Sequence, residues 1–332
     1  MEERIAAGRA LRDVTPLDSH AGWKPSRKRL DPIKILEAQN KTRIPKLVPI
    51  RFGRMMQSPF AFLRGAAAIM AADLATTPTS GVKVQACGDC HLVNFGVFGT
   101  PERGLIFDIN DFDETLPAPW EWDLKRLATS FVVAGRNNGL REKDCRAAAL
   151  ELVRTYRTQM AEFARMHVLD VWYSKLELET FLGQVNDPKF VKKMRAKVKK
   201  ARRSVSDIFP TMTTLRNGKV MIKDEPPLIF HIGDPYEKKA ARIIFRYIDR
   251  YRRTLSENHR TLFDRFRFID IANKVVGIGS VGTTCYVVLL MASADDPLFL
   301  QFKEANASVL EPYAGASQYN HHGQRVVMAA RE

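Results

Sequence analysis

Val82 to Asn94 reads VKVQACGDCHLVN, in which a short alternating strand pattern runs directly into a loop that carries an aspartate and an asparagine. The same arrangement returns at 104–114, GLIFDINDFDE, where a second strand pattern ends in several acidic residues. Asp and Asn are common wherever strands end, so either loop alone is typical of ordinary turns. Two such loops in succession predict a polar site at the ends of two strands.

The segments around these loops favour helices. Phe60 to Leu74 (FAFLRGAAAIMAADL) suits a buried helix, and the pattern that begins at Trp122 (WDLKRLATSFVVAGR) has the spacing of a helix packed on a core. A further helical pattern covers 236–266. The sequence therefore predicts a mainly helical lobe at 46–266, preceded by a polar arm at 1–45 that is rich in basic residues.

From Phe268 onward the pattern changes to strands. Val275 to Gly282 (VVGIGSVG), Cys285 to Met291 (CYVVLLM) and Leu298 to Lys303 (LFLQFK) predict three antiparallel strands with a glycine loop between the first two. The chain is therefore expected to have an α+β fold, with a small antiparallel-sheet lobe at 267–332. Because the chain stops inside a helix pattern, that lobe is expected to be truncated.

Composition indicates a globular protein. The chain has 332 residues, of which 45% are hydrophobic and 27% charged. It contains no apolar run of about 18 residues and no signal-peptide core, so we expect no membrane span and a cytoplasmic location. Four cysteines are too few for a disulfide scaffold in a chain of this size, which agrees with a reducing compartment.

The charge is strongly basic, at +15, and attracts phosphate-rich partners of any kind. Nine of the fifteen residues from Lys189 to Arg203 (KFVKKMRAKVKKARR) are Lys or Arg. Apolar residues recur among them at helical spacing, which predicts a basic helical insertion near 187–204. Its basic face is either solvated or contacts nucleic acid or another polyanion.

The loop after the first strand has the residue types of phosphoryl transfer. Asp89 and Asn94 lie five residues apart. In such enzymes an Asp accepts the proton of the attacking hydroxyl and an Asn completes a magnesium site. Asp108, Asp111 and Asp113 accompany the next strand, and magnesium binds one or two carboxylates together with substrate phosphates. Which of these three carboxylates binds the metal stays open.

The glycine loop predicts the nucleotide-binding half. Gly277-x-Gly279-Ser280-x-Gly282 stands between two strand patterns, whereas a dinucleotide fingerprint needs a helix directly afterward. A glycine loop between strands covers the nucleotide phosphates in kinases. Lys303, at the end of the third strand, is expected to bind the same phosphates. ATP and magnesium are therefore the expected cofactors.

Two long runs carry a family resemblance. GDCHLVNFG at 88–96 and FDINDFDETLPAPWEWDLKRLATS at 107–130 resemble the bacterial family called domain of unknown function 2252, and the resemblance extends from about Ile44 to the end of the chain. The same runs locally resemble aminoglycoside-phosphotransferase-like and protein-kinase-like folds, although many such kinases have His where Cys87 stands.

The kinase-like resemblance implies roles for particular residues. Asp89 would be the catalytic base, assisted by His91, which braces the loop or contacts a phosphate. Asn94 and Asp111 would be metal ligands, and Asp123 would brace the loop. Kinases place the glycine loop before the catalytic loop, whereas this chain has the reverse order. The resemblance therefore implies a circularly permuted, two-lobe kinase-like architecture.

Two function classes remain open at this point. The first is an ATP- and magnesium-dependent phosphotransferase that acts on an unknown acceptor and transfers either a phosphoryl or a nucleotidyl group. The second is a catalytically inactive scaffold that binds a nucleotide or a polyanion. Cys87-Gly-Asp-Cys90-His91 also matches a haem c attachment pattern, but no export signal accompanies it. Arg64 is expected to pair with a site carboxylate or a phosphate, and Arg126 to pack in the core.

Overall fold

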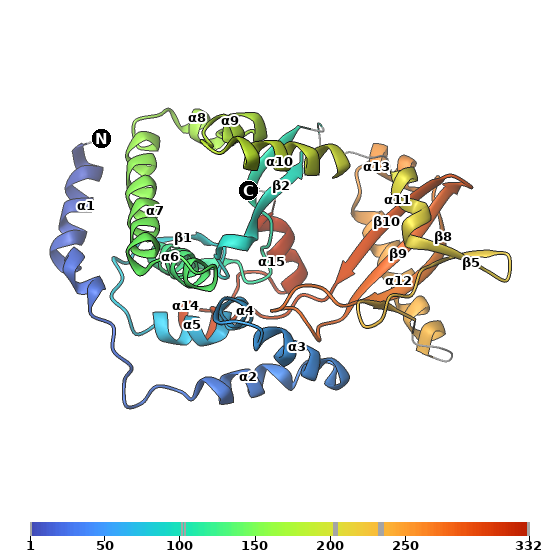
Figure 1. Ribbon diagram of the computed structural model, residues 1–332, viewed down its shortest axis with the longest axis horizontal. Helices are drawn as coiled ribbons and strands as arrows, with labels where there is room; N and C mark the ends of the chain where they lie inside the picture. The colour runs from blue at the N-terminus through green and yellow to red at the C-terminus, as the bar shows by residue number, and fades with distance from the viewer. Residues whose placement is uncertain (1, 101, 103, 202–204, 232–235, 331–332) are drawn as a thin grey trace. The chain divides into compact units, whose positions relative to one another are not determined.

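A computed structural model describes residues 2–100, 102, 104–201, 205–231 and 236–330 (Figure 1). The chain forms two compact units. Unit 1 comprises Met1–Gln184 and Ala305–Glu332, and unit 2 comprises Val185–Glu304. Both units combine helices with antiparallel strands, so the predicted α+β class is confirmed.

Unit 1 is mainly helical. Its α-helices are α1 Glu2–Val14, α2 Pro32–Asn40, α3 Val48–Met55, α4 Pro59–Gly65, α5 Ala67–Leu74, α6 Trp120–Asn137, α7 Glu142–Phe163, α8 Val168–Trp172, α9 Leu178–Gly183, α14 Glu311–Ala314 and α15 His322–Ala329. Short 3-10 helices are η1 Leu17–Ala21, η2 Pro45–Leu47 and η3 Leu92–Asn94. Two antiparallel strand pairs complete the unit: β1 Lys83–Ala86 with β4 Leu116–Pro119, and β2 Phe95–Gly99 with β3 Leu105–Ile109.

The core of unit 1 joins elements that are distant in sequence. Leu74 of α5, Ala86 of β1, Leu116 of β4 and Trp122 of α6 pack in one buried cluster. Leu310, from the C-terminal segment, belongs to the same cluster. Burial of these side chains fixes β1 against α6, and therefore positions the loop that follows β1.

Three local features of unit 1 differ from expectation. The predicted helix at 60–74 is two helices, α4 and α5, because the backbone leaves the helical conformation at Ala66, where φ is −114° and ψ is 28°. Leu116–Pro119, whose two prolines locally favour a turn, is strand β4, and the prolines are tolerated because a two-stranded sheet consists only of edge strands. Within the predicted arm, α2 packs fully buried Leu36 into the unit.

Unit 2 surrounds a four-stranded sheet. Its helices are α10 Pro188–Ala201, α11 Val205–Met212, α12 Tyr236–Thr254 and α13 Glu257–Phe263. The sheet has the order β10 Asp296–Lys303, β9 Cys285–Ser293, β8 Arg267–Lys274 and β7 Ile229–Phe230, and β5 Thr213–Arg216 pairs separately with β6 Lys219–Ile222. Arg202 and Arg203, which end the predicted basic segment, lie outside the described residues.

Both faces of this sheet are covered, as strand alternation requires. Val287 and Leu289 pack on one face with Ile222 of β6, while Val288 and Leu290 pack on the other with Ile244 of α12. The central strand β9 is therefore almost continuously buried, which explains why CYVVLLM lacks polar residues.

The strands of unit 2 follow the prediction with one shift. The first strand is β8, which ends at Lys274, so the whole segment 275–284 is loop. The unit boundaries also differ from the predicted ranges. Residues 305–332 group with unit 1, because Ser308, Val309 and Arg325 bond to its acidic loop, whereas 185–266 group with the sheet.

Across the described part of the chain, every helix is too short or too polar to cross a membrane.

Candidate functional site

The loop after β1 is held by backbone contacts that only glycine permits. Gly88 has a φ of +81°, and a Cβ at this position would collide with the backbone carbonyl of Glu114. Asp123 of α6 accepts hydrogen bonds from the backbone N–H groups of Cys87 (2.6 Å) and Gly88 (3.0 Å). The loop-bracing contact implied for Asp123 is therefore present.

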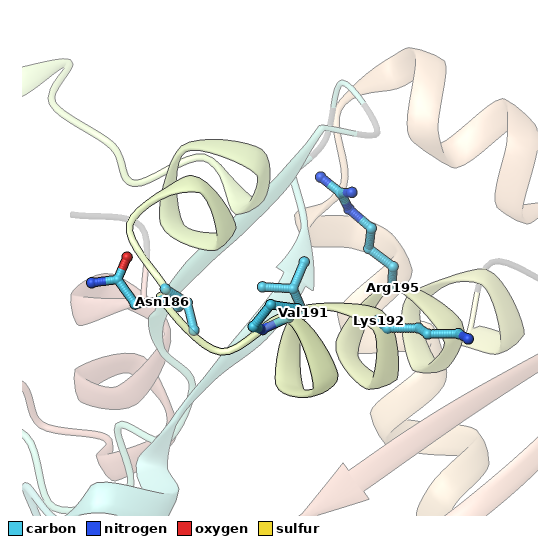
Figure 2. Close-up of a pocket in the computed structure, with 6 residues that line it drawn as sticks. Asn186, Val191, Lys192 and Arg195 are labelled. Atoms are coloured by element: carbon cyan, nitrogen blue, oxygen red, sulfur yellow. The ribbon is translucent and has the colours of Figure 1, made fainter.

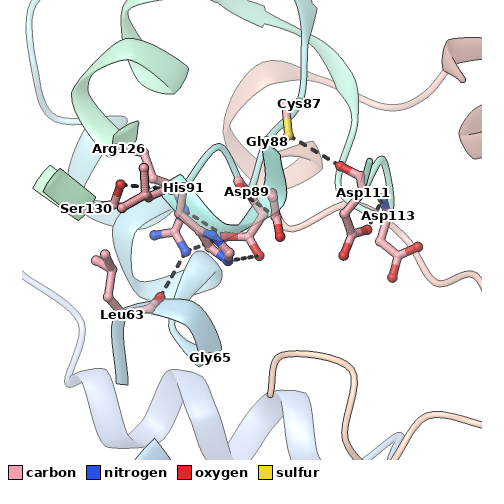
Figure 3. Close-up of polar contacts among 12 residues, drawn as sticks. Leu63, Gly65, Cys87, Gly88, Asp89, His91, Asp111, Asp113, Arg126 and Ser130 are labelled. Carbon is pink, nitrogen blue, oxygen red and sulfur yellow. Dashed lines mark hydrogen bonds and ion pairs between the residues drawn. The ribbon is translucent and has the colours of Figure 1, made fainter. Parts of the chain in front are cut away.

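Asp89 is oriented by Arg126, a buried arginine of α6 (Figure 3). The Nε of Arg126 donates to Oδ1 of Asp89 at 2.8 Å, and Nη2 donates to the same oxygen. Nη2 also donates to the backbone carbonyl of Leu63 at 2.9 Å. Burial raises the pKa of Asp89, and Arg126 and Arg64 oppose that rise. Arg126 is buried as expected, but its main role is to pair with Asp89.

His91 lies beside Asp89 without bonding to it. Its Nε2 is 3.8 Å from Oδ2 of Asp89, and its side chain is only 3% exposed. Burial lowers the pKa of His91 to about 3, with help from Arg126 and Arg64, so the ring is neutral at neutral pH. Its Nδ1 is buried and has no hydrogen-bond partner among the described residues. His91 therefore fits a neutral donor better than a proton shuttle.

Asn94 is tied to the same loop. Its Nδ2 donates to the backbone carbonyl of Asp89 at 2.9 Å, and the residue is 8% exposed. This bond fixes which end of the amide faces the loop. The amide oxygen remains as the acceptor that could face a cation.

The three candidate carboxylates of the second loop are not equivalent. Asp111 Oδ1 accepts the backbone N–H of Asp113 at 3.2 Å, and its carbonyl accepts the thiol of Cys87 at 3.4 Å. Figure 3 shows the carboxylates of Asp111 and Asp113 next to each other, on one side of Asp89. Asp108 is different, because it is exposed on β3 and accepts the N–H of Ile109 at 2.7 Å.

A magnesium ion fits Asp111 and Asp113 on chemical grounds. No group of three or more His, Cys, Asp or Glu side chains is arranged to hold a metal within the described ranges, so a preformed cage of such ligands is absent there. Magnesium usually needs only one or two carboxylates, with water and substrate phosphate as its other ligands. Asp111 and Asp113 offer two neighbouring carboxylates, whereas Asp108 is exposed on β3 and bonds to the N–H of Ile109.

The cysteines of the first loop do not suit metal or redox chemistry. Cys87 and Cys90 are free and buried. Hydrogen bonding to Cys90, together with burial, raises the pKa of the Cys87 thiol, so it stays protonated.

Arg325, which is distant in sequence, binds the C-terminal end of the loop that carries Asp111 and Asp113. Arg325 of α15 is 2% exposed and donates to the backbone carbonyls of Thr115 (2.6 Å), Asp113 (2.8 Å) and Asn306 (2.8 Å). The carboxylate of Glu114 accepts the N–H of Val309 at 2.7 Å. Sequence reasoning missed Arg325, and the only signal was a lone arginine in an otherwise weakly charged helix.

The predicted nucleotide-binding residues all belong to unit 2. Gly277 and Gly282 have φ values of +65° and +94°, which favour glycine, and Gly279 and Ser280 lie in the turn between them. The N–H of Thr283 donates to the carbonyl of Ser280 at 3.1 Å.

Lys303 lies at the same end of the sheet as this glycine loop. It stands opposite Cys285, the first residue of β9 after the loop. The predicted glycine loop and lysine are therefore neighbours within unit 2, while Asp89, His91, Asn94, Asp111 and Asp113 gather in unit 1.

Comparison with known proteins identifies a family. A stretch of 94 residues is 35% identical to the GDP-mannose-dependent alpha-mannosyltransferase of Corynebacterium glutamicum, covering 28% of this chain and 21% of that enzyme. The chain thus matches only about a fifth of that relative's length. No solved structure matches the chain. The family model described as "Uncharacterized protein conserved in bacteria (DUF2252)" matches residues 43–332, and the chain therefore belongs to that family.

Proposed function

We propose that this protein is an ATP- and magnesium-dependent phosphotransferase that acts on a hydroxyl acceptor. The observation that carries the proposal is the environment of Asp89. This carboxylate stands in a loop braced by Asp123, is oriented by Arg126 and lies beside the acidic loop of Asp111 and Asp113. The arrangement combines a candidate base with candidate metal ligands, the two groups that phosphoryl transfer needs most.

Asp89 would act as the general base. Arg126 occupies Oδ1, whereas Oδ2 accepts no hydrogen bond from the residues that the structure describes. Burial raises the pKa of Asp89 and so increases its proton affinity, which favours proton transfer near neutral pH. As the acceptor oxygen bonds to the γ-phosphorus, the bond to the bridging oxygen of ADP breaks. The acceptor proton passes to Oδ2 of Asp89, and ADP leaves.

The remaining residues would hold the nucleotide. Asp111, Asp113 and Asn94 would bind magnesium, which neutralises charge on the phosphates when it is bound. The glycine loop at 277–282 and Lys303 would bind the phosphates.

Calorimetry of magnesium-dependent ATP binding tests the assignment. Asp111→Asn and Lys303→Ala are each expected to weaken binding at least about tenfold, the effect of losing one charged contact. Two charge-matched controls, Asp144→Asn and Lys223→Ala, remove exposed residues that pair with Arg141 and Glu225, and should leave binding unchanged. Unchanged binding in both Asp111→Asn and Lys303→Ala would exclude the kinase-like site.

Turnover tests the base. Asp89→Asn should retain ATP binding and lower phosphotransfer or background ATP hydrolysis by about 100-fold to 10,000-fold, the usual contribution of a general base. If Asp89→Asn turns over ATP at the rate of the unmodified chain, Asp89 is not the base. The same assay separates phosphoryl from nucleotidyl transfer, because the first releases ADP and the second pyrophosphate.

A second candidate function is supported by the basic surface of unit 2. Helix α10 carries seven Lys or Arg and no acidic residue, and its N-terminus borders an open pocket of about 670 Å³ (Figure 2). The pocket is lined by Val185, Asn186, Pro188, Val191, Lys192 and Arg195. Figure 2 shows the side chains of Lys192 and Arg195 extending from the helix. Such a surface suits a catalytically inactive scaffold for a polyanion.

Salt dependence separates this scaffold from the enzyme. A polyanion scaffold should bind single-stranded nucleic acid with an affinity that falls steeply as salt rises, and the double substitution Lys192→Glu/Lys199→Glu should reduce that affinity. The double substitution Glu151→Lys/Glu162→Lys, on α7 of unit 1, is the opposite-sign control. Nucleic-acid binding without any ATP binding would favour the scaffold over the phosphotransferase.

A further inference from the structure

Arg64 has no acidic partner among the residues that the structure describes. It lies near the C-terminal end of α4, and its side chain makes no hydrogen bond and no ion pair with the residues that the structure describes. Its Nε is buried and lacks an acceptor. A partly buried arginine is normally paired, because desolvating its charge is costly. Its missing partner is therefore expected to be a bound anion.

The charge of Arg64 acts on the candidate base and its neighbour. It opposes the rise in the pKa of Asp89 and contributes to the low pKa of His91, so its guanidinium lies near both side chains. Arg126 already occupies one oxygen of Asp89. Arg64 is thus left as a second positive charge beside this carboxylate, in a place where the chain supplies no further acidic side chain within ion-pair distance among the described residues.

The position of α4 decides which ligand this charge would meet. Figure 3 shows Leu63 and Gly65, the residues on either side of Arg64, on one side of Asp89, and Asp111 and Asp113 on the other. The metal-bound phosphates of a nucleotide would lie beside Asp111 and Asp113. Leu63, the neighbour of Arg64, accepts a hydrogen bond from the same Nη2 of Arg126 that donates to Asp89, so α4 lies against the candidate base. A group bound by Arg64 would therefore lie beside this base, where the acceptor hydroxyl must approach.

We infer that Arg64 binds an anionic group of the acceptor, so that the acceptor is a hydroxy compound carrying a phosphate or a carboxylate. The inference rests on the proposed function. A guanidinium suits either group, because its donors match two oxygens of a planar or tetrahedral oxyanion. His91 supplies a second contact: its Nδ1 has no partner within the described residues, and in the tautomer that carries the proton there it can donate to the same anion.

Binding of small anions in the absence of nucleotide tests the inference. Inorganic phosphate would be titrated against the full chain and followed by its ³¹P line width, with acetate as the carboxylate probe that displaces it. Arg64→Ala should weaken phosphate binding at least about tenfold, the loss of one charge-assisted contact. Arg64→Lys should keep part of the affinity, because the charge remains and the planar donor pair is lost. Tighter binding of phosphate or of acetate tells which group the acceptor carries.

A matched control and a fold check accompany these variants. Arg136→Ala removes the same charge from an exposed site on α6, where Arg136 pairs with Glu142 at 2.6 Å, and should leave phosphate binding within about twofold of the unmodified chain. Far-ultraviolet circular dichroism and thermal melting confirm that each variant folds. If Arg64→Ala unfolds, Arg64→Gln and Arg64→Lys carry the comparison.

Three outcomes overturn the inference. The first is equal phosphate binding by Arg64→Ala and the unmodified chain, and the second is no binding of phosphate or acetate by the unmodified chain. The third is a loss of magnesium–ATP affinity in Arg64→Ala as large as its loss of phosphate affinity, which would assign the anion to the nucleotide. Failure of the proposed function is recognised separately, because Asp111→Asn then leaves ATP binding unchanged while the phosphate titration still depends on Arg64. In that case Arg64 binds an anion, but the anion is not part of a phosphotransferase acceptor.

Discussion

Arg126 donates from both Nε and Nη2 to a single oxygen of Asp89, Oδ1, and leaves Oδ2 on the side of His91. One-sided pairing has a chemical consequence. It holds the carboxylate in one orientation while keeping one oxygen available for a proton. A bidentate pair, with one donor on each oxygen, would occupy both lone-pair faces that a general base needs.

Removing Arg126 should therefore destabilise unit 1. Arg126→Met keeps the volume of the side chain but leaves the largely buried carboxylate of Asp89 unpaired. We expect the free energy of unfolding to fall by about 3 kcal/mol. This value is at the low end for a broken buried ion pair, because the side chain of Asp89 is 19% exposed. Urea unfolding followed by tryptophan fluorescence measures it, since Trp122 is buried in this core. The double variant Arg126→Met/Asp89→Asn should recover part of the loss. No recovery would mean that the two residues are not energetically coupled.

Gly88 offers a test that separates backbone strain from collision. Gly81 and Gly88 have nearly equal φ values of +85° and +81°, but a Cβ at Gly81 meets nothing within 4 Å, whereas one at Gly88 would lie 2.8 Å from the carbonyl carbon of Glu114. Gly81→Ala should cost about 1 kcal/mol, the strain of a left-handed residue. Gly88→Ala should cost about 1–3 kcal/mol more in the same urea experiment, because backbone must move. Equal losses would show that the loop adapts freely.

The strands and loops that frame the site could be predicted from sequence. Alternation of apolar residues at 82–86 and at 104–109 indicated β1 and β3, and the acidic residues that follow marked where those strands end. The bracing role of Asp123 came from the resemblance, because periodicity carries no information on hydrogen bonds between a helix and a distant loop. The two strands follow from local sequence patterns, and the role of Asp123 follows from the long sequence run that resembles the family.

The partners of the site residues could not be predicted in the same way. Arg126 and Arg325 are both buried helical arginines, yet the first binds a carboxylate and one carbonyl, and the second binds three carbonyls. The partner of each arginine depends on tertiary contacts between segments far apart in the chain. The strand at 116–119 was missed for a related reason: two prolines favour a turn locally, and the pairing of Ala86 with Leu116 overrides that preference.

Glu114 predicts a pH dependence that one substitution should remove. Burial raises its pKa to about 7, from an ordinary value of 4.5. The folded state therefore binds this proton more tightly than the unfolded state, so the contribution of Glu114 to stability is complete below pH 4.5 and is lost as the pH rises through about 7.

Glu114→Gln should abolish that loss, because the amide stays neutral and its oxygen can still accept the N–H of Val309. Relative to the unmodified chain, the variant should be more stable at pH 8, by no more than about 3 kcal/mol, and should have no such advantage at pH 4. Urea midpoints at several pH values measure the difference, with exposed Glu151→Gln as the control. A constant difference across the range would show that Glu114 is charged in the folded state.

His231, in unit 2, is also expected to lose a stabilising contribution as the pH rises, but at a higher pH. Its Nδ1 lies 2.8 Å from Asp224 and its Nε2 3.1 Å from Asp270, and the hydrogen bonds to Asp270 and Asp224 raise its pKa to about 9. A histidine with a raised folded pKa contributes stability that is complete below pH 6.5 and is lost as the pH rises through about 9. The contribution is at most about 3 kcal/mol, reduced by the exposure of Asp224.

The measurement must report on unit 2 alone. All four tryptophans lie in unit 1, so their fluorescence would follow the wrong unit. Hydrogen exchange is suitable instead, because the N–H of Ile222 donates to the same carboxylate of Asp270 at 2.7 Å. Protection of that amide should fall between pH 7 and pH 9.5, after correction for the intrinsic exchange rate, in the unmodified chain but not in His231→Gln. Gln can still donate to one of the two carboxylates but carries no charge, so equal pH dependence in both proteins would show that the titration of His231 does not stabilise this cluster.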